Sequence, residues 1–198
     1  MRTLTLILSA VLGCSFLGHP AQAQVATTLV VAPTPAPATK LEAFETNIST
    51  VIIKGTTEIG TISVNAGVVS VRCREITDTG SGHKEQGIAL EFLLRDQPKD
   101  TLLIDYDEIA SLSTAVDYLN KLDFSVTPLN FFDATYTTKG GFRVTAFGLR
   151  RSSTVQFSVR DARANMNMAP IALSLQDLAR LKMLIDQAKA TLDSVRGG

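Results

Sequence analysis

Apolar residues recur every three or four positions in two similar stretches of the chain. Residues 104–120 read IDYDEIASLSTAVDYLN, and residues 173–189, 69 positions later, read LSLQDLARLKMLIDQAK. Each stretch passes from an apolar strand end to a short polar residue, then to an acid, and then to a one-sided apolar stripe with a helical period. The pattern predicts two amphipathic helices. Each stripe must pack against another element, and the preceding strands are the nearest candidates.

The first turn of each predicted helix carries capping residues. Asp105 and Ser174 stand at the expected N-cap positions, where a side-chain oxygen can accept from a free backbone N–H. Glu108 and Asp177 follow three residues later, where the partner of a capping box belongs. We therefore expect a capping box at the start of both helices.

Strand patterns precede each helix. In the first half they cover residues 51–54, 58–64, 68–76, 87–96 and 102–104, with a polar loop at 77–86; in the second half they cover residues 130–138, 142–149, 154–161 and 171–173, with a hairpin turn at 139–141, a turn at 150–153 and a loop at 162–170. Residues 42–48 fit either a short helix or an extended lead-in.

The third strand of each half also repeats. Residues 90–96 read LEFLLRD, and residues 155–161 read VQFSVRD. Strand and helix recur in the same order, which predicts an α+β fold of two tandem ββββα repeats, at residues 41–122 and 123–198, packed as an intramolecular pseudo-dimer with antiparallel sheets. The alternative is that two unrelated amphipathic helices resemble each other by composition. The residues predicted to point inward are Leu90, Phe92, Leu94, Val155, Phe157 and Val159.

The N-terminus has the pattern of a secretory signal peptide at residues 1–23. Arg2 precedes an apolar run at residues 4–12, and Ala21-Gln22-Ala23 fits a cleavage site. The run is too short to span a membrane. A second interpretation is a lipobox, Val11-Leu12-Gly13-Cys14, with Cys14 as the lipidated first residue. Either cleavage predicts an exported protein, periplasmic or extracellular.

A flexible spacer is predicted between the signal peptide and the folded part. Residues 24–40 contain Pro33, Pro35 and Pro37 among Ala, Thr and Val, a composition that cannot form a core. Cys73 is the one cysteine left after cleavage at residue 23, so no disulfide can form within that chain. Because Cys73 shares a strand face with Val69 and Val71, a buried thiol is favoured over a free or intermolecularly bridged one.

Charge is divided unequally between the halves, although the formal net charge is zero. Residues 40–122 hold 8 Lys/Arg and 13 Asp/Glu, whereas residues 123–198 hold 10 and 6. The surplus is either ordinary solvated surface or a basic face interleaved with Tyr136 and Phe147, which is typical of single-stranded nucleic acid binding or of binding to another polyanion. The candidate polyanion-binding residues are Lys139, Arg143, Arg150, Arg151, Arg160 and Arg163.

Residues 170–182, PIALSLQDLARLK, are similar to the start of the helix in the whirly superfamily of transcriptional-coactivator-type single-stranded DNA-binding domains. The tandem ββββα order resembles that superfamily, and purine-rich-element-binding repeats have a similar strand order. The resemblance implies that paired units create a sheet surface that holds nucleic acid. The chain lacks the dense basic and aromatic strand surface of that superfamily, so no binding residue is transferred.

Residues for catalysis are scarce. His83 is the one histidine after the signal peptide, which leaves no zinc set and no Ser-His-Asp or Cys-His system. Helix capping accounts for the acidic residues at Asp105, Asp107 and Glu108. Turns at strand ends account for Asp96 and Asp161. We expect no catalytic, metal or cofactor residues.

The sequence therefore predicts an exported non-catalytic module with a binding or structural role in the cell envelope or outside the cell. Its expected partner is a protein or an envelope polymer, with no transmembrane helix after cleavage and with a lipid anchor at Cys14 under the lipobox interpretation. Single-stranded nucleic acid or another polyanion, bound through the basic second repeat, is the alternative. A hydrolase with two carboxylates in a cleft is the third hypothesis.

Overall fold

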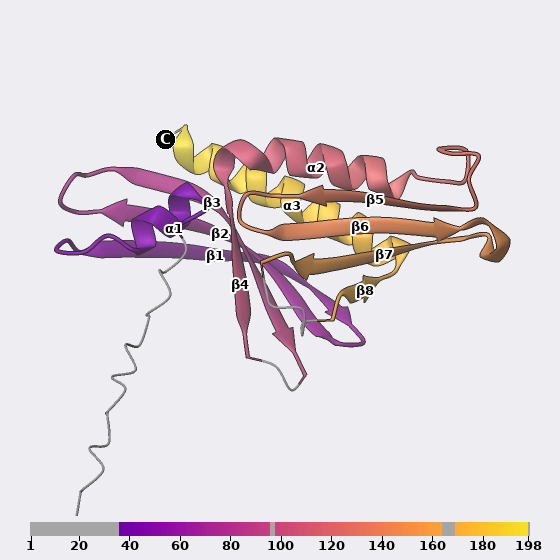
Figure 1. Cartoon of the computed structure of the whole chain (residues 1–198). Coiled ribbons are helices and arrows are strands. Elements are labelled where there is room, and N and C mark those ends of the chain that lie inside the picture. Colours follow the sequence, from indigo (N-terminus) through magenta and orange to yellow (C-terminus); the bar gives the residue numbers. More distant parts are fainter. Residues whose placement is uncertain (1–35, 96–97, 164–168, 198) are drawn as a thin grey trace, which may run out of the picture. The chain divides into compact units, whose positions relative to one another are not determined.

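A computed structural model of the protein describes residues 36–95, 98–163 and 169–197, which belong to one compact unit that begins at Ala36 (Figure 1). The predicted signal peptide, the lipobox at Cys14, the spacer up to residue 35 and Asp96 lie outside the described residues. The sequence prediction assigns Thr39 and Lys40 to the spacer, whereas both belong to the folded unit. Thr39 caps helix α1, Lys40–Glu45, in a capping box with Glu42.

The α+β fold with two ββββα units is confirmed. The first unit comprises β1 (Ile52–Val64), β2 (Gly67–Asp78), β3 (Lys84–Leu94), β4 (Asp100–Asp105) and α2 (Tyr106–Asn120); the second comprises β5 (Phe131–Thr137), β6 (Phe142–Leu149), a 3-10 turn η1 (Arg150–Ser152), β7 (Thr154–Asp161), β8 (Ile171–Leu173) and α3 (Leu175–Arg196). Each sheet has four antiparallel strands in chain order. Successive hairpins account for this order, because antiparallel neighbours need only short turns.

Cross-strand pairing extends the first sheet beyond the predicted strands. The two predicted segments 51–54 and 58–64 form the single strand β1, which has a bulge between Glu58 and Gly60. The predicted polar loop at 77–86 is shorter, because β2 and β3 stay paired as far as Thr77 opposite Lys84. Thr77 and Lys84 are polar and give no strand pattern in the sequence.

One hydrophobic core joins the two units. Helix α3 of the second unit packs on β1, β2 and β3 of the first sheet as well as on β7 and β8, and α2 packs on β3 and β4 and also on β5 and β6. The rings of Phe92 and Phe142, one from each unit, stack with their centroids 6.3 Å apart. Five of the six predicted inward residues are buried, and Val155 is partly buried against the same core. The helices thus bury their stripes across the pseudo-dimer.

The two helix starts differ from each other. Ser174 and Asp177 form the predicted capping box. The prediction for α2 is wrong: Asp105 makes no cap hydrogen bond to its own helix. Its buried carboxylate instead accepts from the backbone N–H groups of Lys40, at 2.9 Å, and Leu41, at 3.2 Å. Backbone donors at the start of α1 have no partner inside that helix, so they bind the nearest buried acceptor.

The side chain of Glu108 also forms a hydrogen bond outside its own helix. Its Oε1 accepts from the backbone N–H of Lys139, 3.0 Å away in the turn between β5 and β6. That turn packs on β4, where a Cβ placed on Gly140 would meet the Leu103 carbonyl oxygen at 2.0 Å. Asp105 at the end of β4 therefore links the first sheet to α1, and Glu108 in the first turn of α2 links that helix to the second sheet.

Candidate ligand-binding surfaces

The second sheet has one covered and one open face. Along β6 the side chains of Phe142, Val144 and Ala146 are buried towards the helices, whereas Arg143, Thr145 and Phe147 alternate with them and are half-buried on the opposite side. We call this opposite side the open face of the second sheet. Its hollow has a volume of about 450 Å³ and is lined by Phe131, Asp133, Thr135, Arg143, Thr145, Phe147, Ser158, Arg160 and Pro170.

Two of the six candidate basic residues meet on the open face. Arg143 and Arg160 are Cα partners in the register between β6 and β7, so the two guanidinium side chains start from adjacent positions on neighbouring strands. Arg143 donates from Nε to Thr137 Oγ1 at 3.0 Å. Within the residues that the structure describes, neither arginine forms an ion pair with a carboxylate. The pair is a local surplus of positive charge.

The side chains of Arg150 and Arg163 are held by contacts with other residues of the chain. Arg150 donates from Nη2 to the carbonyl oxygens of Phe124 and Thr127, each 2.7 Å away, and its guanidinium lies 5.8 Å from the centroid of the Phe124 ring. Arg163 pairs with Glu42 of α1, with Nη1 2.7 Å from Oε1. These contacts occupy the donors that a polyanion would need.

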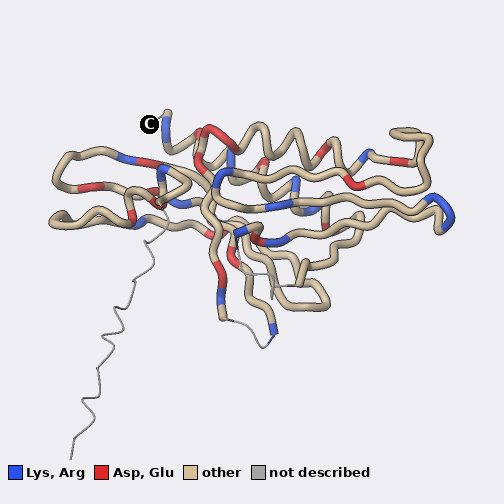
Figure 2. Tube along the Cα trace, in the orientation of Figure 1, with Lys and Arg blue, Asp and Glu red and all other residues tan. Residues whose placement is uncertain are grey.

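Lys139 and Arg151 lie away from the open face. Lys139 is in the turn between β5 and β6, with its Nζ 3.9 Å from Asp107 Oδ2. Arg151 is exposed on η1, the turn that joins β6 and β7, at the opposite end of β6 from Lys139. The basic residues of the second unit are thus spread along the trace (Figure 2). The structure brings together Arg143 and Arg160, and does not bring all six into one patch.

The outer face of the first sheet is partly covered by α1, and its arginines are paired with carboxylates. Leu41 of α1 packs against Ile76, Ala89 and Leu103 in a small second cluster. Beyond α1, Arg72 bridges Glu58, at 3.0 Å, and the buried Glu91, at 3.2 Å. Two further basic residues form ion pairs on this face: Lys99 Nζ lies 2.9 Å from Glu91 Oε1, and Arg74 Nη1 lies 2.9 Å from Glu45 Oε1.

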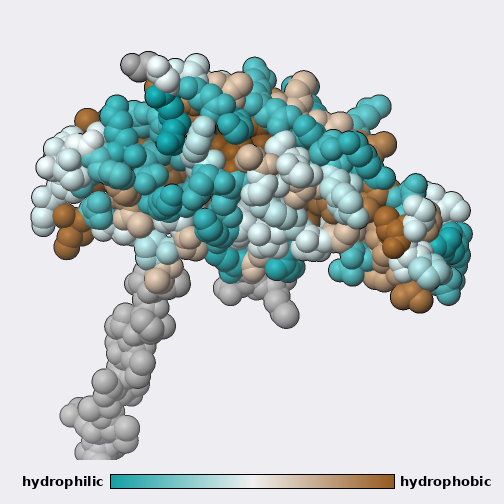
Figure 3. Space-filling view, turned by 90° about the horizontal axis from the view of Figure 1, so that it is seen from above, coloured by the Kyte–Doolittle hydropathy of each residue, from teal (hydrophilic) through white to brown (hydrophobic). Residues whose placement is uncertain are grey.

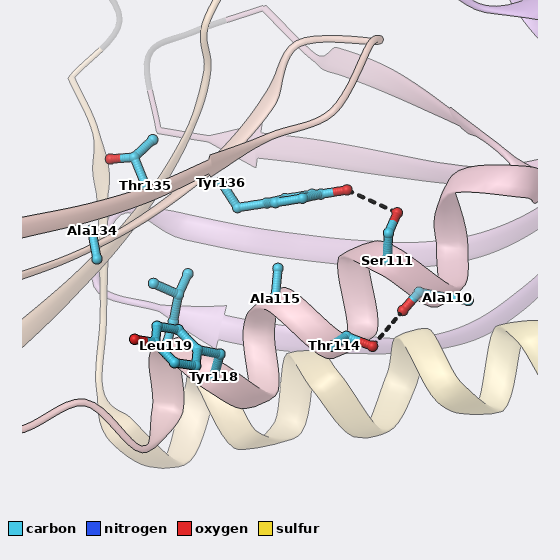
Figure 4. A pocket seen from close by; sticks show the side chains of 9 residues that line it. All are labelled: Ala110, Ser111, Thr114, Ala115, Tyr118, Leu119, Ala134, Thr135 and Tyr136. Carbon is cyan, nitrogen blue, oxygen red and sulfur yellow. Dashed lines mark hydrogen bonds between the residues drawn. The ribbon is translucent and has the colours of Figure 1, made fainter.

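A groove runs between α2 and the edge strand β5. It has a volume of about 650 Å³ and is lined by Ala110, Ser111, Thr114, Ala115, Tyr118, Leu119, Ala134, Thr135 and Tyr136 (Figure 4). None of these lining residues is charged. The hydroxyls of Ser111 and Tyr136, 2.9 Å apart, close one end. Apolar residues also reach the surface among hydrophilic ones in the view of Figure 3. Sequence reasoning missed this groove, because small residues on a helix give no binding signal.

Cys73 and His83 have ordinary environments. Cys73 is buried as predicted, with Sγ 3.4 Å from the Ala188 carbonyl oxygen, and burial raises the pKa of its thiol to about 11. His83 is exposed, its Nε2 lies 3.2 Å from Glu85 Oε1, and its ring lies beside Phe44. The described part of the chain contains no group of three or more His, Cys, Asp or Glu residues placed to hold a metal ion.

Comparison with protein-family models, with curated proteins and with solved structures finds no match to this chain. Among the described residues, no helix has both the length and the apolar composition needed to cross a membrane. Function has to be argued from the two surfaces themselves.

Proposed function

We propose that the chain is an exported, non-catalytic binding module that holds an anionic polymer on the open face of the second sheet. The observation that carries this proposal is the adjacent pair Arg143 and Arg160 without a carboxylate partner in the described structure. Like charges opposite each other destabilise a sheet. A bound phosphate, sulfate or carboxylate would remove that repulsion and accept charge-assisted hydrogen bonds from both guanidinium groups.

The rest of the open face supports an extended ligand. Hydroxyl groups of Thr145 and Ser158, which are register partners, continue from the arginines along the sheet. Phe147 and the exposed Phe131 follow further along and offer flat apolar surfaces. Aromatic rings next to cationic groups suit single-stranded nucleic acid, whose bases stack, and also acidic polysaccharide, whose sugar rings have apolar faces. The signal-peptide pattern at residues 1–23 supports an exported site of action.

Binding of two polymers at several salt concentrations tests the proposal. The full chain is titrated with a labelled single-stranded oligothymidylate and, separately, with heparin. We expect the R143A/R160A variant to lose about tenfold in affinity for either polymer that binds. For the oligothymidylate, the slope of log K against log salt should be shallower in this variant than in the parent chain by about 1.4, since each lost contact with single-stranded phosphate contributes about 0.7.

The matched control is K139A/R151A, which removes the same charge away from the open face. It should retain affinity within about twofold, because remote exposed charges are largely screened. Absence of binding to both polymers at low salt contradicts the proposal. An equal loss in both variants also contradicts it, because attraction would then depend on net charge and not on the open face. If F131A/F147A loses binding to the oligothymidylate but not to heparin, the two rings stack on bases. If it loses binding to heparin but not to the oligothymidylate, the ligand is a polysaccharide.

A further inference from the structure

The four outer sheet edges of the described structure are not equally protected. Free strand edges attract other chains, and proteins protect them with short strands, bulges, charges or covering segments. Strand β8 has three residues. Strand β1 carries a bulge at Glu58/Gly60 and the charges of Lys54 and Glu58. The turn between β5 and β6 packs on β4 at Gly140.

Strand β5 has fewer of these protections, because Asp133 is its one charged residue. Its seven residues, FFDATYT, pair with β6 without a register shift, and no described strand pairs on its other side. The strand contains no Lys, Arg, Pro or Gly. It therefore offers a regular row of backbone donors and acceptors along one side.

The groove lies directly on this free edge. Ala134 and Tyr136 are packed against the core on the covered side of the sheet, whereas Thr135 points to the open face. All three line the groove between β5 and α2. A hollow that receives side chains from both faces of one strand has to pass along the edge of its backbone. Across the groove, α2 presents the small side chains of Ala110 and Ala115.

The chemistry of the groove and its rim restricts the occupant. The uncharged lining fits a segment with small apolar side chains at alternate positions. Asp133 is exposed on the open face of β5, and its carboxylate forms no ion pair or hydrogen bond with another described residue. A strand placed beside β5 would put a side chain next to that carboxylate, where a basic residue is favoured and an acidic one is disfavoured.

We propose that this groove is a docking site for an extended, basic segment of a partner protein. The segment adds to the second sheet as a strand beside β5, points its small apolar side chains at Ala115 and Leu119 of α2, and places a Lys or Arg next to Asp133. Backbone hydrogen bonds supply affinity, while alternate side chains supply specificity. This site does not use Arg143 or Arg160, although Asp133 and Thr135 also line the hollow of the open face.

A pair of synthetic peptides tests this docking site. One alternates valine with threonine over seven residues and has lysine at the central threonine position; the other has glutamate there. We expect the full chain to bind the lysine peptide about fivefold more tightly than the glutamate peptide, as measured by fluorescence anisotropy or calorimetry. The D133K variant should reverse the preference, and R143A/R160A should leave it unchanged. A lysine peptide N-methylated on the edge that faces β5 should lose at least tenfold in affinity, because it cannot donate to the strand.

Filling the groove provides a second test. Ala115→Leu places a larger side chain between α2 and β5 and keeps a strong helix former, so the melting temperature should stay close to that of the parent chain. Binding of the lysine peptide should fall at least tenfold. Equal affinity for both peptides in the parent chain and in D133K overturns the proposal. It is also overturned if the parent chain is a dimer in sedimentation experiments and A115L makes it monomeric, because a second copy would then cover the edge.

Discussion

Helices α2 and α3 begin with similar sequences, but their polar residues make different kinds of contact. At α3, Ser174 and Asp177 bind each other's backbone within one turn. At α2, Asp105 binds the start of α1 and Glu108 binds the turn between β5 and β6. A short acidic side chain at a helix start binds whichever backbone donors come within reach. Local contacts at α3 and long-range contacts at α2 thus arise from one sequence pattern.

The outer faces of the two sheets differ in the same way. Helix α1 covers part of the first sheet, and Arg72 and Arg74 are matched by carboxylates. On the second sheet, Arg143 and Arg160 face solvent without such partners in the described structure. Arg72 and Arg74 on the first sheet are therefore held by ion pairs within their own unit, whereas Arg143 and Arg160 on the second sheet have no such ion pair with a described residue. Four pairs of variants test these two comparisons and the contact between the units.

The largest effect is expected from Asp105→Ala. The variant leaves the N–H groups of Lys40 and Leu41 without their acceptor, and two hydrogen bonds to a charged group contribute about 3 kcal/mol to the free energy of unfolding. Urea denaturation measures the loss, and hydrogen exchange should show faster exchange at the Lys40 and Leu41 amides. Asp107→Ala, at the exposed neighbouring acid, is the control and should cost less than about 1 kcal/mol. A loss of the same size in both variants would mean that Asp105 does not hold α1.

Arg72→Ala should have the next largest effect. It removes the bridge between Glu58 and Glu91, and Glu91 is buried, so we expect a loss of about 2 kcal/mol. Arg143→Ala is the matched change on the other sheet. It should leave stability within about 0.5 kcal/mol or increase it slightly, because a like-charge neighbour is removed. Similar losses for the two variants in chemical denaturation would refute the contrast between the faces.

A smaller effect is expected from Ser174→Ala. The capping box of α3 loses the acceptor for the Asp177 N–H, at a cost of about 1 kcal/mol. The faster hydrogen exchange should be confined to the first turn of α3, since the contact is local. Thr154→Ala, an exposed substitution on the second sheet, serves as the control and should change the unfolding free energy by less than about 0.5 kcal/mol. Accelerated exchange in α1 or in the first sheet would be the contrary result.

The smallest effect is a gain from Asp100→Asn. Burial, and then the charge of Asp161 in the other unit, raise the pKa of the Asp100 carboxyl, whose Oδ2 is buried without a described hydrogen-bond partner. A carboxyl with a raised pKa binds its proton more tightly in the folded state, so its ionised form destabilises the fold at neutral pH. The variant should be more stable by less than about 1 kcal/mol at pH 7, and the gain should disappear as the pH falls below about 4.

Asp123→Asn is the control of opposite sign. A hydrogen bond to Ser125 lowers the pKa of Asp123, so its ionised form stabilises the fold above the ordinary pKa of the group. Asp123→Asn should therefore be slightly less stable than the parent chain at pH 7, and the difference should vanish in acid. Denaturation curves at both pH values check the pair. A loss of stability in Asp100→Asn at pH 7 would show that the two units do not repel each other at Asp100 and Asp161.

Sequence reasoning located most elements and part of the candidate site. It predicted β6 and β7 at the residues where they are found, because both strands alternate cleanly between apolar and polar positions. It also included Arg143 and Arg160 among the candidates. It did not separate them from Arg150 and Arg163, because the partners of those two lie 21 to 121 positions away in the chain. Arg150 donates to Leu129, Thr127 and Phe124, and Arg163 pairs with Glu42. Nor did it indicate the groove along β5.

The doubled ββββα order and the residues that face the interior follow from the amino-acid sequence alone, because the hydrophobic period depends on near neighbours in the chain. Tertiary structure decided the packing of α2 and α3 on both sheets and the anchoring of α1 by Asp105. It also decided that, among the described residues, β5 has one unpaired edge and Arg143 and Arg160 have no carboxylate partner. Each depends on which distant segments come within a few ångströms of one another. Only the packing of the two units around one core determines that proximity.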